Sequence, residues 1–306
     1  MRIELSDFEN YLNLGLKPSN VFGSADFIRL NAHKADKVIA AVGDCSAGVV
    51  FGEINNGLSS PWSAPYLSVD TPSSFSENDI IEFGRDARNV LADYENIRVT
   101  TPPAVYRGPE NPFFEGFRRD GDEVITDTSF YIPLIDAEGE KSWNKSARRN
   151  LKRALSAGLR AIRSDNADEC YNLICSHHHA LGYNMAMTLE EVRDTAKIIP
   201  VDFWLVKYGE TNLAAMYCYR VRHDIVQVIS SGDTPGGRNV GAAIFMERAI
   251  IDYYRNLFIN ELHIADAFID HGPTSVMGVQ NEGLAAFKTS FGCLMSPKLT
   301  LLHKRR

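Results

Sequence analysis

The chain has 306 residues, of which 44% are apolar and 23% charged, and its formal net charge is -7. This length suits two hydrophobic cores better than one, and the composition is that of an ordinary globular protein rather than a fibrous or disordered one. The negative charge excludes generic binding to nucleic acid or to an anionic membrane, except through a local basic patch.

The cysteines and the N-terminal segment indicate a reducing compartment. The cysteine count is 5, an odd number, and no two cysteines form a C-x-x-C pair, which disfavours both a disulfide framework and a zinc ribbon. The N-terminal segment 1–10 is acidic where a secretory signal needs an apolar run, and no later stretch approaches about 18 apolar residues. We therefore expect a cytoplasmic protein without a membrane span.

The first half of the chain shows alternating helix and strand signals. A short helix is predicted over 22–35, and two apolar runs separated at Gly43-Asp44 follow as a hairpin. The proline-rich stretch 58–74 must be loop or edge strand. Within it, Trp62 and Tyr66 either line a groove for an acceptor substrate or pack as loop aromatics.

A polar linker is predicted to divide the chain. A helix over 77–94, with Ser76 as its N-cap, precedes it. The glycine-containing run 136–141 is the best linker signal, and we therefore predict two domains, 1–140 and 141–306. Both halves show helix, strands, helix and strand in that order, which indicates a weak duplication of architecture.

The second half begins with a basic helix over 142–157 and two further helices over 166–181 and 188–198. Strands over 201–208, 213–221 and 225–230 are predicted to form an antiparallel meander. The remaining elements are a long helix after a glycine-rich loop, a strand over 261–268, a helix over 282–290 and a strand over 294–302. The predicted fold class is α/β, more narrowly α+β, with mixed, largely antiparallel sheets flanked by helices.

The glycine-rich turn after this meander is the feature most typical of a binding site. The chain runs from a strand through Gly232-Asp-Thr-Pro-Gly-Gly and Arg238-Asn-Val-Gly-Ala-Ala into the long helix. Such a turn aims unpaired backbone N–H groups at the place where the helix dipole is positive. We expect it to bind phosphate.

Two common nucleotide motifs are excluded at this turn. Gly232 and Gly237 have the glycine spacing of a Walker loop, but Arg238-Asn239 stands where that loop requires Lys-Ser/Thr. The dinucleotide fingerprint G-x-G-x-x-G is absent, and the flanking strands are predicted to be antiparallel rather than part of a βαβ unit.

The turn resembles the pyrophosphate loop of the acyl-CoA N-acyltransferase (GNAT) superfamily. That loop has the form Q/R-x-x-G-x-G/A and is matched by Arg238-x-x-Gly241-x-Ala243. The resemblance implies two tandem GNAT-like domains, of which the first is degenerate and the second binds acyl-CoA as co-substrate. The residues it implies for donor binding are Gly236, Gly237, Arg238, Asn239, Val240, Gly241, Ala242, Ala243 and Asn281.

Two further segments are similar to the Fem-like branch of tandem-domain aminoacyltransferases. One ends in Phe287-Lys288-x-x-Phe291-Gly292, and the other is the basic run 146–159. Lys288 stands where the usual GNAT tyrosine protonates the leaving thiolate, as it does in Fem-like proteins. The long helical arm of Fem enzymes has no counterpart in the sequence, which favours acyl-CoA over aminoacyl-tRNA as the donor by a modest margin.

Acyl transfer to an amine needs a base for the ammonium and an acid for the leaving group. Asp266, near the C-terminal end of the strand predicted over 261–268, is the candidate base, and the alternative is that it caps the following turn. Asp270 and His271, in the next loop, are lesser candidates. Lys288 is expected to contact a phosphate or the leaving group, the alternative being a helix lysine whose stem covers apolar surface.

The basic helix is the local positive patch. It either binds an acceptor that carries phosphate or carboxylate, or tRNA, or forms a solvated face. Nearby, His177-His-His179 invites a metal site, but adjacent helical side chains point in different directions, so we expect no metal. The cations of the patch are Lys145, Arg148, Arg149, Lys152 and Arg153.

The sequence thus predicts an N-acyltransferase that moves an acyl group from acyl-CoA to a small-molecule or peptide amine. The alternatives are a Fem-like aminoacyltransferase that uses aminoacyl-tRNA and a non-catalytic binding protein with the same fold.

Overall fold

The computed structural model describes residues 3–43, 47–137 and 139–304. Asp44 of the predicted hairpin turn and Cys45 lie outside these ranges. The chain divides into two compact units that interleave in the sequence, whereas the predicted domains 1–140 and 141–306 are contiguous. Unit 1 comprises Met1–Thr128, Ser275–Gln280 and Ser296–Arg306, and unit 2 comprises Ser129–Thr274 and Asn281–Met295.

Unit 1 contains a mixed sheet in the order β1-β2-β3-β4-β6-β15, with β5 beside β3. Its pairs are antiparallel except for β4 and β6. The predicted hairpin is confirmed as the antiparallel pair β2–β3. The strands are β1 (Ile3–Asp7), β2 (Lys37–Gly43), β3 (Ala47–Ile54), β4 (Gly57–Ser60), β5 (Val69–Asp70), β6 (Asn96–Thr100) and the C-terminal part of β15 (Leu294–Lys304).

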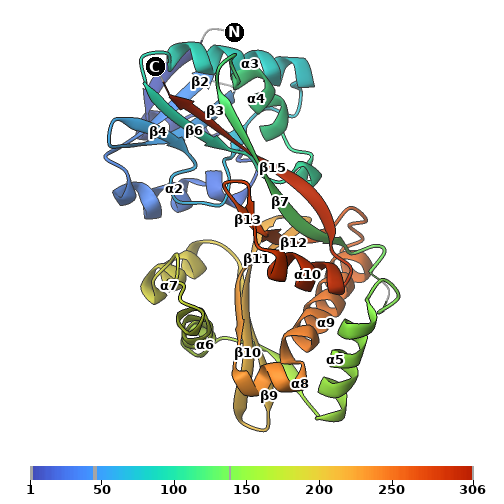
Figure 1. Cartoon of the computed structure of the whole chain (residues 1–306). Coiled ribbons are helices and arrows are strands. Elements are labelled where there is room, and N and C mark those ends of the chain that lie inside the picture. Colours follow the sequence, from blue (N-terminus) through green and yellow to red (C-terminus); the bar gives the residue numbers. More distant parts are fainter. Residues whose placement is uncertain (1–2, 44–46, 138, 305–306) are drawn as a thin grey trace. The chain divides into compact units, whose positions relative to one another are not determined.

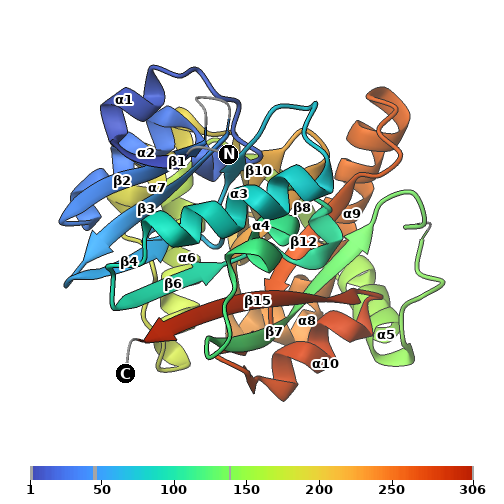
Figure 2. The same ribbon diagram turned by 90° about the horizontal axis from the view of Figure 1, so that it is seen from above.

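Two helices of unit 1, α3 (Glu77–Val90) and α4 (Glu110–Phe117), lie side by side (Figure 2). Small residues allow this approach, because a Cβ on Gly84 would be 2.2 Å from the Phe113 carbonyl oxygen. Ser76 caps α3 as predicted. The predicted helix over 22–35 is shorter in the structure, α2 (Ala25–Asn31), with a 3-10 turn on each side. α1 (Phe8–Leu12) follows β1.

The aromatics of the proline-rich stretch are packed within unit 1. The Tyr66 side chain is fully buried, and its hydroxyl donates to the Tyr106 hydroxyl at 2.9 Å. The Trp62 indole donates to the carbonyl oxygen of Asn31 at 3.0 Å. Tyr66 is therefore a core residue, and Trp62 packs at the margin of the core.

Unit 2 contains the sheet β7-β12-β11-β10-β9-β8. The predicted meander is confirmed, since β9 and β11 both pair antiparallel with β10. The strands are the C-terminal part of β7 (Glu123–Pro133), β8 (Arg160–Ser164), β9 (Val201–Tyr208), β10 (Thr211–Arg222), β11 (Ile225–Asp233) and β12 (Phe268–Pro273).

Helices cover both faces of this sheet (Figure 1). α6 (Ala167–Ala180) and α7 (Leu189–Ile198) lie on one face of β9–β11, and α5 (Lys145–Ser156) and α9 (Ala242–Arg255) lie on the other. On the face that α5 and α9 cover, apolar strand residues such as Trp204 and Met216 form one core with Ile250 and Tyr254 of α9. The short helices α8 (Pro235–Val240) and α10 (Glu282–Ser290) complete the unit.

Three expectations for the second half are wrong. Residues 235–240 form α8 instead of an open loop. Residues 261–268 do not form a strand, because α9 continues as a π-helical turn, Asn256–Glu261, and β12 begins only at Phe268. β12 pairs parallel with β11, not antiparallel. The reason is that α9 returns the chain to the end of the sheet at which β11 begins. Within the described ranges, no helix is long and apolar enough to cross a membrane.

Candidate active site

The parallel strands β11 and β12 separate in the middle of the unit 2 sheet. Their register ends at the pair Gln227–Asp270, while β11 continues to Asp233 and β12 to Pro273. β11 remains paired with β10 on its other side, and a bulge at Ile229 interrupts that register. Residues 228–233 of β11 thus have an edge that does not pair with β12, and an extended ligand could pair with such an edge. We call this place the strand opening.

Lys288 of α10 holds the end of β12. Its ammonium donates to the carbonyl oxygens of His271 at 2.6 Å, Gly272 at 2.9 Å and Pro273 at 3.2 Å. Successive carbonyls of a regular strand point in opposite directions, so the chain must turn for all three to converge. Gly272 supplies that turn with a φ of 71°. The side chain of Lys288 therefore shapes the part of β12 that departs from β11.

Buried titratable groups surround this ammonium. Burial lowers the pKa of Lys288 to about 8, against the opposing effect of Asp270. Burial raises the pKa of Glu247 on α9 to about 8 and, with the charge of Lys288, lowers the pKa of His271 to about 3. At neutral pH this places the positive charge of Lys288 near a neutral acid, a neutral imidazole and the carboxylate of Asp270. The Glu247 carboxyl oxygen Oε2 lies 3.7 Å from His271 Nδ1.

Asp270 anchors the last paired residues of the two strands. Its carboxylate accepts hydrogen bonds from Gln227 Nε2 at 3.2 Å, Ser129 Oγ at 3.3 Å and the Gly272 N–H at 2.8 Å. The side chain is buried. Such a bonded carboxylate is a positioning group for the strand opening.

The predicted phosphate-binding segment forms a junction of two helices. Gly241 ends α8 and begins α9 in the left-handed conformation, with a φ of 81°. α9 begins without a side-chain cap hydrogen bond, so its first turn keeps N–H groups for another acceptor. Thr234 caps α8 instead, where its hydroxyl accepts from the Gly237 N–H at 2.9 Å. Arg153 of α5 donates to the Asn239 carbonyl oxygen at 2.6 Å and holds the junction against α5.

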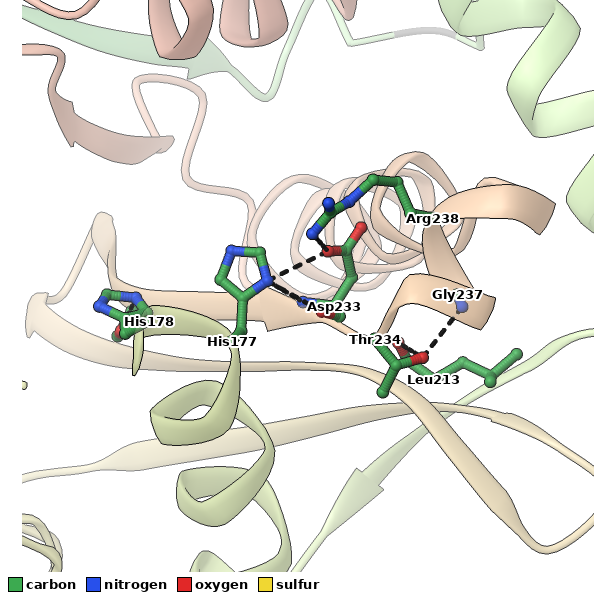
Figure 3. Close-up of polar contacts among 8 residues, drawn as sticks. His177, His178, Leu213, Asp233, Thr234, Gly237 and Arg238 are labelled. Carbon is green, nitrogen blue, oxygen red and sulfur yellow. Dashed lines mark hydrogen bonds and ion pairs between the residues drawn. The ribbon is translucent and has the colours of Figure 1, made fainter. Parts of the chain in front are cut away.

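A polar group at the end of β11 joins this junction to α6 (Figure 3). Arg238 and His177 both point toward Asp233. An Arg238 guanidinium nitrogen lies 3.0 Å from Asp233 Oδ1, and His177 Nδ1 lies 3.2 Å from the same oxygen. His177 Nδ1 is also 2.8 Å from the Asp233 carbonyl oxygen. Arg238 is more than half exposed, whereas Asp233 is nearly buried.

The structure places the predicted site residues in three groups. Arg238, Asn239, Val240, Gly241, Ala242 and Ala243 lie at the helix junction, with Gly236 and Gly237 in the preceding turn of α8. Lys288 lies at the strand opening. Asn281 is apart from the junction in sequence and serves as the N-cap of α10, where it accepts from the Leu284 N–H at 3.0 Å.

The sequence predicts that Asp266 lies near the end of a strand. In the structure it does not lie at a strand end that borders the strand opening. It is an exposed turn residue ahead of β12. The carboxylate within the strand is that of Asp270, four positions later, because the π-helical turn after α9 delays the start of β12. The predicted strand position of Asp266 was therefore wrong, whereas its role as the base stays a prediction.

Sequence reasoning missed the pairing of His177 with Asp233. The two residues are 56 positions apart in sequence, and the histidine run by itself suggests only a metal site. An acidic residue after a strand and a histidine in a helix are individually ordinary. Only the packing of α6 on β11 brings them together.

No protein-family model and no curated protein matches the chain, but solved structures do. FemX matches at a TM-score of 0.63 and 11% identity, over 98% of this chain and 97% of that one. The C-terminal domain of a putative lysylphosphatidylglycerol synthetase from Agrobacterium fabrum matches at 0.58 and 10%, over 96% and 90%. A tandem GNAT protein from the clavulanic acid biosynthesis pathway matches at 0.50 and 8%, over 100% and 99%.

Identities this low establish the fold alone, and each match extends over nearly the whole of both chains. The strand opening and the uncapped start of α9 lie in the half where the GNAT resemblance was strongest. The chain has a tandem GNAT-like fold.

Proposed function

We propose that unit 2 is an N-acyltransferase that takes its acyl group from acyl-CoA and passes it to an amine. The observation that carries the proposal is the strand opening, where β11 and β12 part after Gln227 and Asp270. The pantetheine arm of CoA is extended and contains amide groups, so it can add to the free edge of β11 as a further strand would. The thioester would then lie between the two strands.

The helix junction fits the diphosphate of the same donor. The first turn of α9 has no side-chain cap, and its N–H groups and dipole favour an anion. Arg238 is exposed next to this turn and can pair with two phosphate oxygens. To do so it would exchange Asp233 for the phosphates, because its guanidinium is bonded to that carboxylate in the structure.

Lys288 would act in this reaction through its charge. All three protons of an ammonium are used when it donates to three carbonyls, so it is poorly placed to protonate a leaving thiolate directly. A buried positive charge at the opening favours the negative charge that develops on a tetrahedral intermediate. Lys288 also holds β12 in the shape that keeps the opening.

Neighbouring structures support a transferase without specifying its substrates. FemX and a tandem GNAT protein share this fold. The acceptor amine of this chain, as a small molecule or a peptide, is part of the proposal.

Binding of acyl-CoA tests the proposal directly. We expect acetyl-CoA or a longer acyl-CoA to raise the thermal unfolding temperature at millimolar concentration, because a ligand of the folded state stabilises it by mass action. Incubation of the bound protein with a panel of amines should give free thiol and an amide detectable by mass spectrometry. Absence of any shift with all acyl-CoAs would reject the proposed donor.

A specific observation keeps aminoacyl-tRNA as a second candidate donor. Arg148, Arg149 and Lys152 of α5 are exposed, and Arg153 of the same helix contacts the helix junction. This basic face lies beside the place proposed for the donor phosphates, so a polyanion could use both. Binding of charged tRNA at low salt, lost in the triple variant Arg148→Gln, Arg149→Gln, Lys152→Gln, would favour this donor over acyl-CoA.

A further inference from the structure

We propose that Gln227 binds the acceptor amine of the transfer reaction through its side-chain carbonyl oxygen, Oε1. This inference rests on the proposed function, and it names a residue for the acceptor at the strand opening. Gln227 and Asp270 form the last register pair of β11 and β12. Gln227 Nε2 donates a hydrogen bond to Asp270 Oδ2 at 3.2 Å. This bond therefore spans the two strands at the point where they separate, which borders the place proposed for the thioester.

The hydrogen bond to Asp270 fixes the direction in which the Gln227 amide faces. A carboxylate offers only acceptors, so the NH2 group of the amide must face it and Oε1 must face away. The carboxylate is held in turn by the Ser129 hydroxyl at 3.3 Å and the Gly272 N–H at 2.8 Å. Asp270 is thus a positioning residue, and Gln227 is the residue assigned to the substrate.

The oxygen Oε1 of Gln227 is buried and has no donor. Only 4% of the residue is exposed, and within the described ranges 3–43, 47–137 and 139–304 no group hydrogen-bonds to this oxygen. Leaving a buried carbonyl oxygen without a donor costs free energy, and such groups in native proteins are nearly always satisfied. We therefore expect a donor from outside the chain, and an N–H of a bound amine is such a donor.

Gln227 points to the face of the sheet that α6 and α7 cover. Its neighbours Val226 and Val228 pack in the core beneath α9, and successive residues of a strand point to opposite faces. The partner of Gln227 on β10 is Tyr219, whose hydroxyl lies 3.6 Å from the sulfur of Met187, between α6 and α7. We call this side of the unit 2 sheet the α6 face.

The opposite face of the strand opening carries a positive charge. His271 points to that face, where its ring packs on Phe291 with centroids 5.3 Å apart. The Lys288 ammonium lies on the same side, 5.8 Å from the centroid of the Phe130 ring. An alkyl amine is an ammonium at neutral pH. It is repelled by Lys288 and attracted by the carboxylate of Asp270, so charge favours its approach from the α6 face.

Attack on the thioester comes from a face of the sheet. When the pantetheine arm pairs with β11, its amide carbonyls lie in the plane of the sheet, as those of a strand do. We place the thioester carbonyl in the same plane, and a nucleophile approaches a carbonyl carbon from above or below its plane. An amine that donates an N–H to Oε1 of Gln227 is on the α6 face, beside the last paired residues. It is therefore held on a side from which attack is open.

A binding test is simple because the chain has two glutamines, Gln227 and Gln280. Glutamine labelled in the side-chain carbonyl carbon gives two NMR signals, and the variant Gln280→Glu identifies the signal of Gln227. We expect millimolar propylammonium to shift that signal, because Oε1 accepts an N–H. Tetramethylammonium has the same charge and no N–H, so it should leave the signal in place, and the Gln280 signal should respond to neither cation.

Two results of this titration would overturn the proposal. One is a Gln227 signal that neither propylammonium nor any amine of the transfer screen moves, which would leave water as the donor to Oε1. The other is an equal shift with tetramethylammonium, because that cation cannot donate a hydrogen bond. Neither result depends on a substitution at Gln227, so the test holds even where variants of this buried residue fail to fold.

Kinetics separates amine binding from a structural role. Gln227→Met removes both polar groups of the amide, whereas Gln227→Lys keeps a donor for Asp270 and removes the acceptor. Both variants should raise the KM for the amine about tenfold, as the loss of one hydrogen bond predicts, with the Kd of acyl-CoA unchanged. Gln280→Met is the matched control and should change neither constant. A fall in kcat and in acyl-CoA affinity with an unchanged KM would assign Gln227 to the shape of the strand opening and overturn the proposal.

The two hypotheses fail differently. An unchanged KM for the amine in both Gln227 variants, in a protein that still transfers acyl groups, overturns the amine site and leaves the proposed function intact. A protein that binds no acyl-CoA overturns the proposed function, and the response of the Gln227 signal to propylammonium then still shows whether this amide binds an amine.

Discussion

The carbonyl oxygen of Asn150 in α5 lies directly against Gly241 at the start of α9. A Cβ on residue 241 would be 2.5 Å from that oxygen, and the φ of 81° already disfavours a side chain. The one segment that matches a phosphate-binding pattern is therefore also a close contact between two helices. The glycine is required there by packing as well as by any ligand.

Gly241→Ala should destabilise the protein by about 2–3 kcal/mol, as expected for a strained backbone with a steric clash. It should also weaken acyl-CoA binding, because α5 must move away from the junction. Urea unfolding and calorimetry measure the two effects. Gly236→Ala is the control, since the nearest atom to its Cβ would be 3.8 Å away; an equal loss in both variants would contradict the packing argument.

Lys288→Met should lower the free energy of unfolding by about 3 kcal/mol, since the carbonyls of β12 would lose their buried donor. Acyl transfer should fall at least tenfold, because β12 loses both its shape and the adjacent charge. Lys197→Met removes an exposed lysine paired with Asp194 and should change neither quantity measurably. Unchanged stability of Lys288→Met would show that the three contacts are dispensable.

Arg238→Gln should weaken acyl-CoA binding about tenfold, which is about 1.4 kcal/mol. The guanidinium of Arg238 is exposed on α8, which precedes α9, so its effect should shrink as salt is added. Isothermal titration at two ionic strengths checks both statements. Arg193→Gln, which removes an exposed arginine from α7, is the comparison, and a similar loss there would mean that the effect of Arg238 is not local.

The stability difference between Glu247→Gln and the unmodified protein should depend on pH. The pKa of Glu247 is raised to about 8 in the folded state from an ordinary 4.5. Glu247 therefore contributes fully to the stability of the folded protein below its pKa in the unfolded chain. This contribution is lost as pH rises through its pKa in the folded protein. Glutamine does not titrate. Between pH 5 and pH 7 the free energy of unfolding of the variant should therefore rise by about 3 kcal/mol relative to that of the unmodified protein. Parallel unfolding curves over that range would contradict the shift.

Asp266→Asn should leave kcat/KM unchanged and the free energy of unfolding within about 0.5 kcal/mol, because the residue is an exposed turn aspartate. Asp270→Asn should lower both, since its carboxylate accepts three hydrogen bonds at the last paired residues of β11 and β12. Steady-state kinetics with the amine found in the transfer screen compares them. Loss of activity in Asp266→Asn alone would restore it as the base.

Local signals in the sequence account for much of the fold. Ser76 and Thr188 precede acidic residues at the capping-box spacing, and both helices begin where those signals lie. The antiparallel meander β9–β11 could be predicted because its strands are consecutive and joined by short turns. The same locality let Gly241 be assigned to the start of the long helix, whereas Arg238 lies in the separate helix α8.

Contacts between distant residues were decided only by the tertiary structure. The parallel pairing of β12 with β11 depends on how α9 packs, and that pairing alone creates the strand opening. The assignment of Ser296–Arg306 to unit 1 depends on β15 pairing with β6, about two hundred residues earlier in the chain. Sequence patterns record which residues are apolar and where the backbone can turn. They do not record which surfaces meet, and the meeting of α6 with β11 is what brings His177 to Asp233.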